Sequence, residues 1–341
     1  FDPNLFDYTN YNSSTLGAVL DNPYRPLINR VTQGLYPPGS VFKVVNVAAA
    51  LKSGLFERDT TYTCTGVWDE LGANFIKYDW TVAKELPPHG EINLPQALTY
   101  SCNTYNYHIG FELYNEVDPE YLPKIAREFG LGRPTGIVGL LEGTNEEVGG
   151  IVPDAKWKQE NIGEEWSAGD HVNMAIGQGT VLFTPIQAAQ MISIVANRGT
   201  LYRPRLVKEI LTPANEAYAR SAAEVLNRFS LSEETWNFLD EALSQVVDNG
   251  TGQSCKIPGV RVGGKTGTAQ NPHGKDHAWF VAYAPVGNPV IAVSVLVEHG
   301  LKGSVSAAPI ARKVILAALS DVAALEPETV SSRAVQGISG D

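Results

Sequence analysis

The stretch VRVGGKTGTAQNPHGKDHAWFVAYAPVGNPVIAVSVLVE, residues 260–298, contains three candidate strand segments separated by turn residues. Beta-branched and aromatic residues between breaks rich in Gly and Pro are typical of strands. They predict strands at Val260–Ala269, His277–Ala284 and Val290–Glu298. The last two are joined by a short connector, residues 285–289, that suits a hairpin. The stretch therefore predicts a cluster of antiparallel strands.

Helices are predicted on both sides of these strands. Thr184 and Pro185 supply an N-cap and a proline at the first helical position, and Asn197 and Gly199 close that helix. Residues 1–39 and 131–180 are rich in Gly, Pro and Asn and are predicted to be irregular. The other predicted helices lie at Ser40–Lys52, Leu94–Leu113, Pro119–Phe129, Ser232–Asn249 and Ala307–Leu319.

This order of elements predicts an α+β fold in which helices flank an antiparallel sheet. We expect one domain over residues 1–319 with a mostly helical lobe at about 44–200, followed by a polar tail over 320–341. Three strands are fewer than a sheet usually has. We therefore expect the N-terminal strands of the sheet to be absent from this chain, upstream of Phe1.

Composition excludes some classes of function. The chain has 341 residues, and its 26 Lys and Arg against 37 Asp and Glu give a net charge of −11. Nucleic-acid-binding proteins usually carry a basic patch, and no run of Lys or Arg occurs, so no nucleic-acid partner is expected. No window approaches the ~18 apolar residues of a membrane-spanning helix. Because the chain starts at Phe1 rather than Met, we expect a fragment of a longer protein.

The first motif whose side chains could take part in catalysis is Ser40-Val-Phe-Lys43, which follows Gly39. At the start of a helix, residues three apart lie on one face, with Cβ atoms about 5–6 Å apart. A neutral Lys there can take the proton of the Ser hydroxyl, and free N–H groups at the helix N-terminus can stabilise an oxyanion. The alternative is an N-capping Ser next to a surface Lys, because Ser-x-x-Lys arises about once by chance in such a chain.

Two further motifs carry similar chemistry. Ser101-Cys102-Asn103 offers a hydroxyl that can relay a proton and an amide that can hold a carbonyl group, although Ser and Asn also cap helices. Lys265-Thr266-Gly267-Thr268 lies on a predicted strand, where alternation puts both Thr hydroxyls on one face to bind a carboxylate. Gly267 leaves the strand flat, so that an extended peptide can lie beside it.

The same stretch also matches a phosphate-binding pattern. Residues 259–266 satisfy G-x-x-x-x-G-K-[ST], which holds phosphates only where a helix follows the loop. Here Gly267, Pro272 and Gly274 follow, and then a strand. The nucleotide interpretation is therefore rejected.

In this order, S-x-x-K, S-x-N and K-T-G are the motifs of serine β-lactamases and penicillin-binding proteins. The surrounding sequence resembles class B penicillin-binding proteins, particularly those of cell elongation, from residue 1 to about 319. The stretches that carry the resemblance include Phe1-Asp-Pro-Asn, Pro26-Leu-Ile-Asn-Arg, Tyr36-Pro-Pro-Gly-Ser-Val-Phe-Lys43, Ser101-Cys-Asn-Thr-Tyr105, Gly177-Gln-Gly179, Gly264-Lys-Thr-Gly-Thr-Ala-Gln270 and His277-Ala-Trp-Phe-Val281. The resemblance implies the penicillin-binding transpeptidase fold.

The resemblance also implies a D,D-transpeptidase that cross-links peptidoglycan stem peptides and is inhibited by β-lactams. Ser40 would attack the penultimate D-Ala and form an acyl-enzyme, with Lys43 as its base. Ser101 would pass the proton to the leaving amine, Asn103 would hold the stem-peptide amide, and Lys265 would face the same site. These five are the predicted catalytic residues.

The predicted substrate-binding residues are Thr266, Gly267 and Thr268. The resemblance implies that the two Thr side chains bind the terminal carboxylate of the D-Ala-D-Ala substrate. The backbone N–H groups of Ser40 and Thr268 would form the oxyanion hole. A β-lactamase or a β-lactam sensor of the same superfamily is the alternative, and an inactive cell-wall scaffold is a further one.

No cofactor and no metal are expected. Cys64, Asp69, Asp79 and His89 have side chains that can bind metals, but their spacing is looser than that of zinc sites, so they are interpreted as solvated loop residues. The resemblance implies three kinds of partner, namely stem peptides, β-lactam antibiotics and a membrane glycosyltransferase of the elongation machinery. It also implies a location at the extracytoplasmic face of the bacterial membrane, through an anchor outside this chain.

Overall fold

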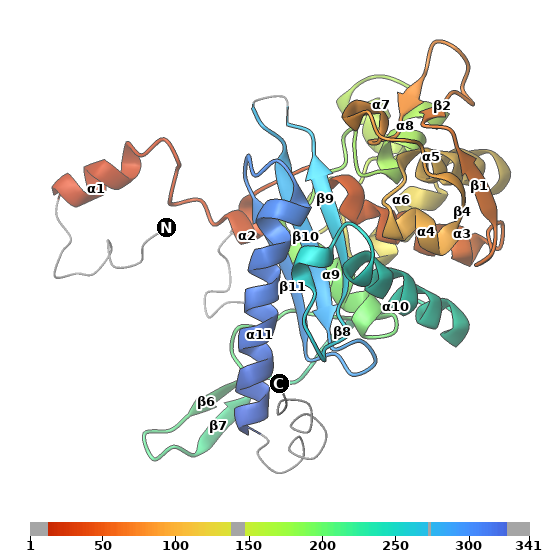
Figure 1. Ribbon diagram of the computed structural model, residues 1–341. Helices are drawn as coiled ribbons and strands as arrows, with labels where there is room; N and C mark the ends of the chain where they lie inside the picture. The colour runs from red at the N-terminus through yellow and green to blue at the C-terminus, as the bar shows by residue number, and fades with distance from the viewer. Residues whose placement is uncertain (1–12, 138–146, 272–273, 326–341) are drawn as a thin grey trace.

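The computed structural model describes residues 13–137, 147–271 and 274–325. Its centre is a sheet in the order β11-β10-β9, with every neighbouring pair antiparallel (Figure 1). The three strands are β9 (Gly263–Ala269), β10 (His277–Ala284) and β11 (Ile291–Val297). Their ends fall within three residues of the ranges that the sequence predicts, and the α+β class is confirmed.

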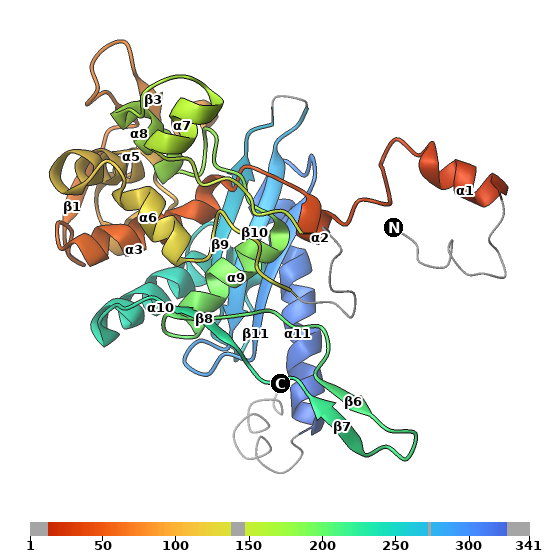
Figure 2. The ribbon, with the colours of Figure 1, turned by 180° about the vertical axis from the view of Figure 1, so that it is seen from behind.

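Helices cover both faces of this sheet. α11 (Ala308–Leu325) lies on one face, and α9 (Pro185–Ala196) lies on the other (Figures 1 and 2). All eight residues of β10 are buried, and they alternate between the two layers. Trp279 and Val281 pack in the core that includes α9, whereas Phe280 packs in the core that includes α11. The strand is therefore apolar on both faces.

The helical lobe packs against the β9 side of the sheet. α3 (Lys43–Ser53) is its central helix, and the first eight residues of α3 are all buried. The lobe also includes α4 (Leu94–Thr99), α5 (Asn103–Glu112), α6 (Tyr121–Glu128), α7 (Ala155–Asn161) and α8 (Ala168–Ala175). The short helix η2 (Gly39–Phe42) leads into α3 and contacts β9, so the lobe and the sheet meet at this point.

The remaining elements are short or peripheral, except α10 (Glu233–Asp248), which contacts β9 and α4. The paired short strands are β1 (Thr61–Cys64) with β4 (Gly90–Asn93), β2 (Val67–Trp68) with β3 (Lys77–Tyr78), β5 (Thr200–Tyr202) with β8 (Val225–Arg228), and β6 (Glu209–Leu211) with β7 (Ala217–Arg220). The remaining helical segments are α1 (Ser13–Leu20), α2 (Arg30–Gln33), η3 (Val82–Lys84), η4 (Leu113–Val117), η5 (Gln253–Cys255) and η6 (Gly303–Ala307).

Two of the predicted helices are confirmed by their caps. The Thr184 side chain accepts the backbone N–H of Gln187, and the Gln187 side chain accepts the backbone N–H of Thr184. Pro185 occupies the first position of α9. Ser232 caps α10 through the N–H of Thr235. These signals are local in sequence, which explains why they could be recognised without the structure.

Other segments differ from the prediction. Residues 94–113 form two helices, not one, because Ser101 has a left-handed backbone with φ of 56° that no right-handed helix continues through. Residues 131–180, predicted to be irregular, contain α7 and α8, which begin at the capping residues Asp154 and Ser167. These side chains accept backbone N–H groups and so outweigh the glycines nearby.

The two ends of the described chain also differ from the prediction. Residues 1–39 include α1 and α2, and Asn29 caps α2 by accepting the N–H of Val31. α11 continues to Leu325, beyond Ser320, where the polar tail is predicted to begin. The helix formers Ala323, Ala324 and Leu325 favour this extension. The rest of the predicted tail, 326–341, lies outside the described residues.

Candidate active site

The segment that carries Ser40 is fixed on three sides. Tyr36 pairs with Phe183, and the indole N–H of Trp279 donates to the Pro37 carbonyl at 3.0 Å. The N–H of Gly39 donates to the Gly177 carbonyl at 2.9 Å. Gly39 has φ of 55°, and a Cβ there would lie 2.4 Å from the Thr268 carbonyl oxygen. Only glycine allows this approach, which brings the start of the helix against β9.

Ser40 lies in η2, and Lys43 follows at the start of α3. A 3₁₀ helix has three residues per turn, so side chains at i and i+3 lie directly above one another. The Lys43 N–H donates to the Ser40 carbonyl and closes this turn. Ser40 is half-buried and Lys43 is fully buried. Ser40 and Lys43 therefore lie on the same face of this turn.

A hydrogen-bond network joins the three motifs. Lys43 Nζ donates to the Ser101 carbonyl at 2.7 Å, to Asn103 Oδ1 at 2.6 Å and to Ser101 Oγ at 3.3 Å. Lys265 Nζ donates to the same Ser101 Oγ at 2.8 Å and to the Thr266 carbonyl at 3.3 Å. The Ser101 hydroxyl thus lies between two lysines that come from α3 and β9.

Both lysines are in an unusual electrostatic environment, because each is completely buried. Burial lowers the pKa of Lys43 to about 8, although the Asp79 carboxylate opposes this. Burial, and then the charge of Lys43, lower the pKa of Lys265 well below its usual range. Since the two amines share one hydroxyl, a charge on either makes a charge on the other less favourable. The site therefore favours a neutral amine within reach of Ser101.

The backbone of Ser101 is strained where it presents this hydroxyl. Its φ of 56° is in the left-handed region, which costs a residue with a side chain about 1–2 kcal/mol. The strain is held by contacts on both sides, from Lys43 Nζ to the Ser101 carbonyl and from the Asn103 N–H to Asp79 Oδ2 at 2.6 Å. Such strain persists where the surrounding structure over-determines a functional position.

Asp79 is a site residue whose role the sequence analysis missed, because it interpreted Asp79 as a solvated loop residue. It is buried, and besides Asn103 it accepts the Thr81 N–H at 3.1 Å and lies 3.3 Å from His89 Nε2. Burial alone would raise the pKa of Asp79, but the hydrogen bonds and the charge of Lys43 hold it below its usual range. The only local signal is an Asp two residues before a Thr, which is common in turns.

One group of side chains beside the motifs could hold a metal. The ligand atoms of Cys64, Asp79 and Cys102 lie within 4.8 Å of one another, and all three residues are buried. Thiolates and carboxylates are ligands that zinc accepts. The interpretation of Cys64 and Asp79 as solvated loop residues is wrong, because both are buried and Cys64 lies in the paired strand β1. A second group of potential ligands, nearer the surface, is Glu70, His108 and Glu112.

The two threonines of the K-T-G strand differ in their exposure to solvent. Thr268 is exposed, whereas Thr266 is buried and its Oγ1 lies 2.6 Å from Thr251 Oγ1. A Cβ on Gly267 would lie 3.0 Å from Val41 and 3.1 Å from the Pro38 carbonyl. Gly267 is thus required where η2 packs on β9, which is a different reason from the flat strand surface that the sequence suggested.

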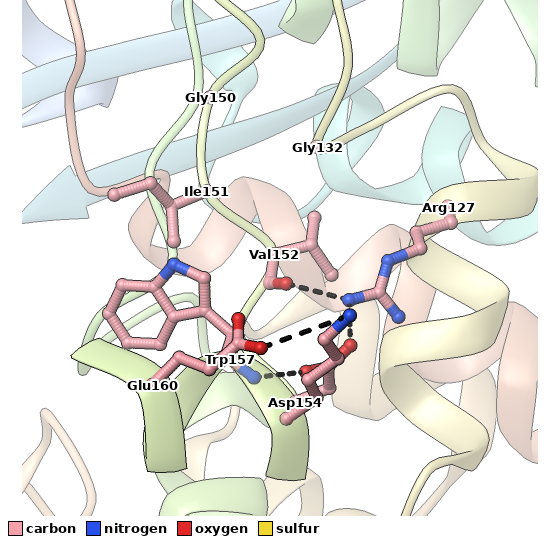
Figure 3. A pocket seen from close by; sticks show the side chains of 9 residues that line it. Arg127, Gly132, Gly150, Ile151, Val152, Asp154, Trp157 and Glu160 are labelled. Carbon is pink, nitrogen blue, oxygen red and sulfur yellow. Dashed lines mark hydrogen bonds and ion pairs between the residues drawn. The ribbon is translucent and has the colours of Figure 1, made fainter. Parts of the chain in front are cut away.

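A separate cavity of about 260 Å³ lies in the helical lobe (Figure 3). Arg127 pairs there with Asp154 and donates to the Val152 carbonyl at 3.0 Å. Trp157 and Glu160 also line it. No residue of the three motifs does, so this cavity is not part of the candidate active site.

Comparison with known proteins identifies the family. A family model described as the penicillin binding protein transpeptidase domain matches residues 1–316. The chain belongs to this family. Penicillin-binding transpeptidase domains are also its structural neighbours, and the predicted penicillin-binding fold is confirmed. None of the helices in the described part of this domain is long and apolar enough to cross a membrane.

Curated relatives agree with the cell-elongation resemblance. The peptidoglycan D,D-transpeptidase MrdA of Acinetobacter baumannii is 32% identical over 329 residues, which cover 92% of this chain and 47% of that protein. The peptidoglycan D,D-transpeptidase PbpA of Mycolicibacterium smegmatis is 31% identical, with 94% of this chain and 63% of that protein covered. The chain spans about half the length of the MrdA proteins that it matches.

Solved structures show the same fold. Pseudomonas aeruginosa PBP2 in complex with WCK 5153 has a TM-score of 0.78 and 31% identity, with 92% of this chain and 65% of that chain covered. The ceftriaxone acyl-enzyme of penicillin-binding protein A from M. tuberculosis has a TM-score of 0.77 and 30% identity, with 94% and 69% covered. The complex of PBP2 and MreC from Helicobacter pylori has a TM-score of 0.74 and 28% identity, with 92% and 54% covered.

Proposed function

We propose that this chain is the catalytic domain of a peptidoglycan D,D-transpeptidase of the cell-elongation type, with the domain spanning residues 1–319. The observation that carries the proposal is Ser101 Oγ, which lies 3.3 Å from Lys43 Nζ and 2.8 Å from Lys265 Nζ. Burying two amines around one hydroxyl is unfavourable for stability alone. Such an arrangement suits a path for protons, as perturbed lysines in active sites do.

The first half of the reaction forms an acyl-enzyme. Ser40 Oγ attacks the carbonyl carbon of the penultimate D-Ala, and neutral Lys43 accepts the Ser40 proton. The backbone N–H groups of Ser40 and Thr268 stabilise the oxyanion. Ser101 passes a proton to the nitrogen of the terminal D-Ala as the peptide C–N bond breaks. Free D-Ala leaves, and the rest of the stem peptide stays on Ser40 as an ester.

The second half transfers the acyl group. The amine of a second stem peptide attacks the ester, gives up its proton through the same Ser101 and Lys43 groups, and forms the cross-linking amide. Ser40 recovers its hydroxyl hydrogen. Asn103 holds the amide of the donor stem peptide, and its backbone is fixed by Asp79. Thr266 and Thr268 bind the terminal carboxylate.

Intact mass after incubation with benzylpenicillin tests the proposal. A β-lactam ring opens without losing a leaving group, so acylation adds the whole mass of the antibiotic. We expect one adduct per chain that persists for hours, because a transpeptidase hydrolyses such an ester slowly. An adduct that disappears within seconds while antibiotic is consumed would indicate a β-lactamase instead. A folded protein that gains no mass would contradict acylation altogether.

The rate of this acylation should rise with pH. The active form of Lys43 is the neutral amine, and a lysine is neutral above its pKa, which burial lowers to about 8. The rate constant for benzylpenicillin should therefore increase between pH 6 and pH 9, with half of the increase reached near pH 8. Circular dichroism at each pH verifies that the fold is constant. A rate that falls with pH would mean that the charged amine is the active form.

We infer that the protein acts at the extracytoplasmic face of the bacterial membrane, held by an anchor outside this chain, beside a membrane glycosyltransferase. Two structural relatives support a partnered enzyme. One is the Helicobacter pylori PBP2 in complex with MreC, and the other belongs to a peptidoglycan synthase complex that coordinates polymerization and crosslinking. Co-purification of the full-length protein with a polymerase that extends glycan chains tests this, and recovery of the enzyme alone from detergent extracts of its own cells would contradict it.

A further inference from the structure

The turn Gly250-Thr251-Gly252 connects two of the three motif segments. The Thr251 N–H donates to the Thr99 carbonyl at 3.4 Å, and Thr99 lies two residues before Ser101. A Cβ on Gly250 would lie 2.3 Å from the same carbonyl oxygen, and the Gly252 N–H donates to the Val246 carbonyl at 2.8 Å. The turn is therefore held closely between the end of α4 and the last turn of α10.

From this turn the Thr251 side chain reaches the K-T-G strand. Its Oγ1 lies 2.6 Å from Thr266 Oγ1, a short hydrogen bond between two hydroxyl groups. Thr266 is only 7% exposed, whereas Thr251 is half-buried. The next residue toward the N-terminus, Lys265, donates to the Thr266 carbonyl and to Ser101 Oγ. The hydrogen bond with Thr251 thus fixes the side chain of Thr266, the residue that follows Lys265.

The direction of this hydrogen bond decides what Thr266 can bind. A hydroxyl has one hydrogen to donate and can accept two hydrogen bonds. If Thr266 donates to Thr251, it has no hydrogen left for an anion. If Thr251 donates to Thr266, the Thr266 hydrogen is free to bind a carboxylate, which only accepts. In that second case the hydrogen bond from Thr251 to Thr266 polarises the Thr266 hydroxyl and strengthens its hydrogen bond to the carboxylate.

We infer that Thr251 is a positioning residue that directs the Thr266 hydroxyl hydrogen toward the carboxylate of the substrate. This inference rests on the proposed function, because it takes the ligand of Thr266 to be the terminal carboxylate of D-Ala-D-Ala or of a β-lactam. Thr251 acts through Thr266 and strengthens the hydrogen bond from Thr266 to the carboxylate. The turn that contains Thr251 also fixes the end of α4.

Two substitutions at position 251 separate hydrogen bonding from packing. Thr251→Val keeps the shape and removes the hydroxyl, whereas Thr251→Ser keeps the hydroxyl and removes a methyl group. We expect Thr251→Val to lower the second-order rate of acylation by benzylpenicillin about tenfold, in line with the loss of support for one hydrogen bond to a charged group. We expect Thr251→Ser to stay within about twofold of the wild type. The loss should appear mainly in the concentration dependence rather than in the limiting rate.

The methyl ester of benzylpenicillin tests the link to the carboxylate. The ester lacks the negative charge, so Thr251→Val should slow its acylation much less than that of the acid. The matched control is Thr99→Val, because the Thr99 hydroxyl donates at 3.0 Å to the Pro95 carbonyl within its own helix and not to β9. This control should leave the preference for acid over ester unchanged.

Each other result has a definite meaning. If Thr251→Ser is as slow as Thr251→Val or slower, or if acid and ester slow equally, Thr251 acts through packing and the inference is overturned. In that case wild-type acylation still supports the proposed function. If the folded wild type is acylated by neither compound, the proposed function fails, and the assignment of Thr251 fails with it.

Discussion

Ser40→Ala should abolish the covalent adduct with benzylpenicillin, because we propose that the Ser40 oxygen is the atom that becomes acylated. Ser40 lies in the 3₁₀ turn that leads into the buried Lys43, whose pKa is lowered to about 8. Removing the nucleophile of a serine hydrolase reduces turnover by roughly 10⁶-fold. Intact mass after hours of incubation with excess antibiotic should therefore show only unmodified protein.

Ser53→Ala is the matched control for this experiment. Ser53 is the last residue of α3, the helix that begins three residues after Ser40, and its hydroxyl donates to the Ala50 carbonyl at 2.7 Å. This variant should acquire the adduct at the wild-type rate. Since a half-buried Ser tolerates Ala, both variants should melt near the wild-type temperature. An adduct of full mass on folded Ser40→Ala would assign the nucleophile to another residue.

Lys43→Met should lower the rate of acylation by roughly 10²–10⁴-fold, the usual contribution of a general base. Met fills nearly the same volume as the buried Lys side chain but has no amine. Ser40 then keeps its position but loses its proton acceptor, so the adduct should still form, very slowly. The rate of the remaining reaction should also lose the rise toward pH 8, and stopped-flow or quenched-flow mass measurements follow both effects.

Lys52→Met provides the comparison on the same helix. Lys52 is a partly exposed residue of α3 that pairs with Glu128 at 3.6 Å. Exposed ion pairs contribute about 0–1 kcal/mol, so this variant should fold and react almost normally. In Lys43→Met, Asp79 keeps three partners, namely the N–H groups of Thr81 and Asn103 and the His89 side chain. If the Lys43→Met protein is folded and acylated at the wild-type rate, Lys43 is not the base, and Lys265 takes that role.

Much of the sheet and several helices could be predicted from local patterns. The apolar runs of β10 and β11 stand between turn residues, and the caps at Thr184 and Ser232 mark the starts of α9 and α10. Caps that lie among glycines were harder to recognise. Asp154 and Ser167 begin helices in a segment whose composition suggests a loop, because one side-chain hydrogen bond can outweigh a low average propensity.

In the candidate site too, local motifs could be recognised from the sequence, whereas contacts between distant residues could not. The motifs named Ser40, Lys43, Ser101, Asn103 and Lys265 individually, and each motif is contained in four or fewer adjacent residues. The sequence did not reveal the roles of Asp79 and Thr251, which contact motif residues across 24 and 15 positions of the chain. Neither residue has a neighbouring pattern that indicates its burial or its partner.

The sequence by itself determined the types of side chain and their short spacings, and with them the class of chemistry. Only the tertiary structure decided how those groups are charged and aimed. The fold breaks the helix at Ser101, buries both lysines against one hydroxyl and brings Gly39 into contact with β9. Each of these features depends on partners far away in sequence, because desolvation and close packing arise only when separate segments meet.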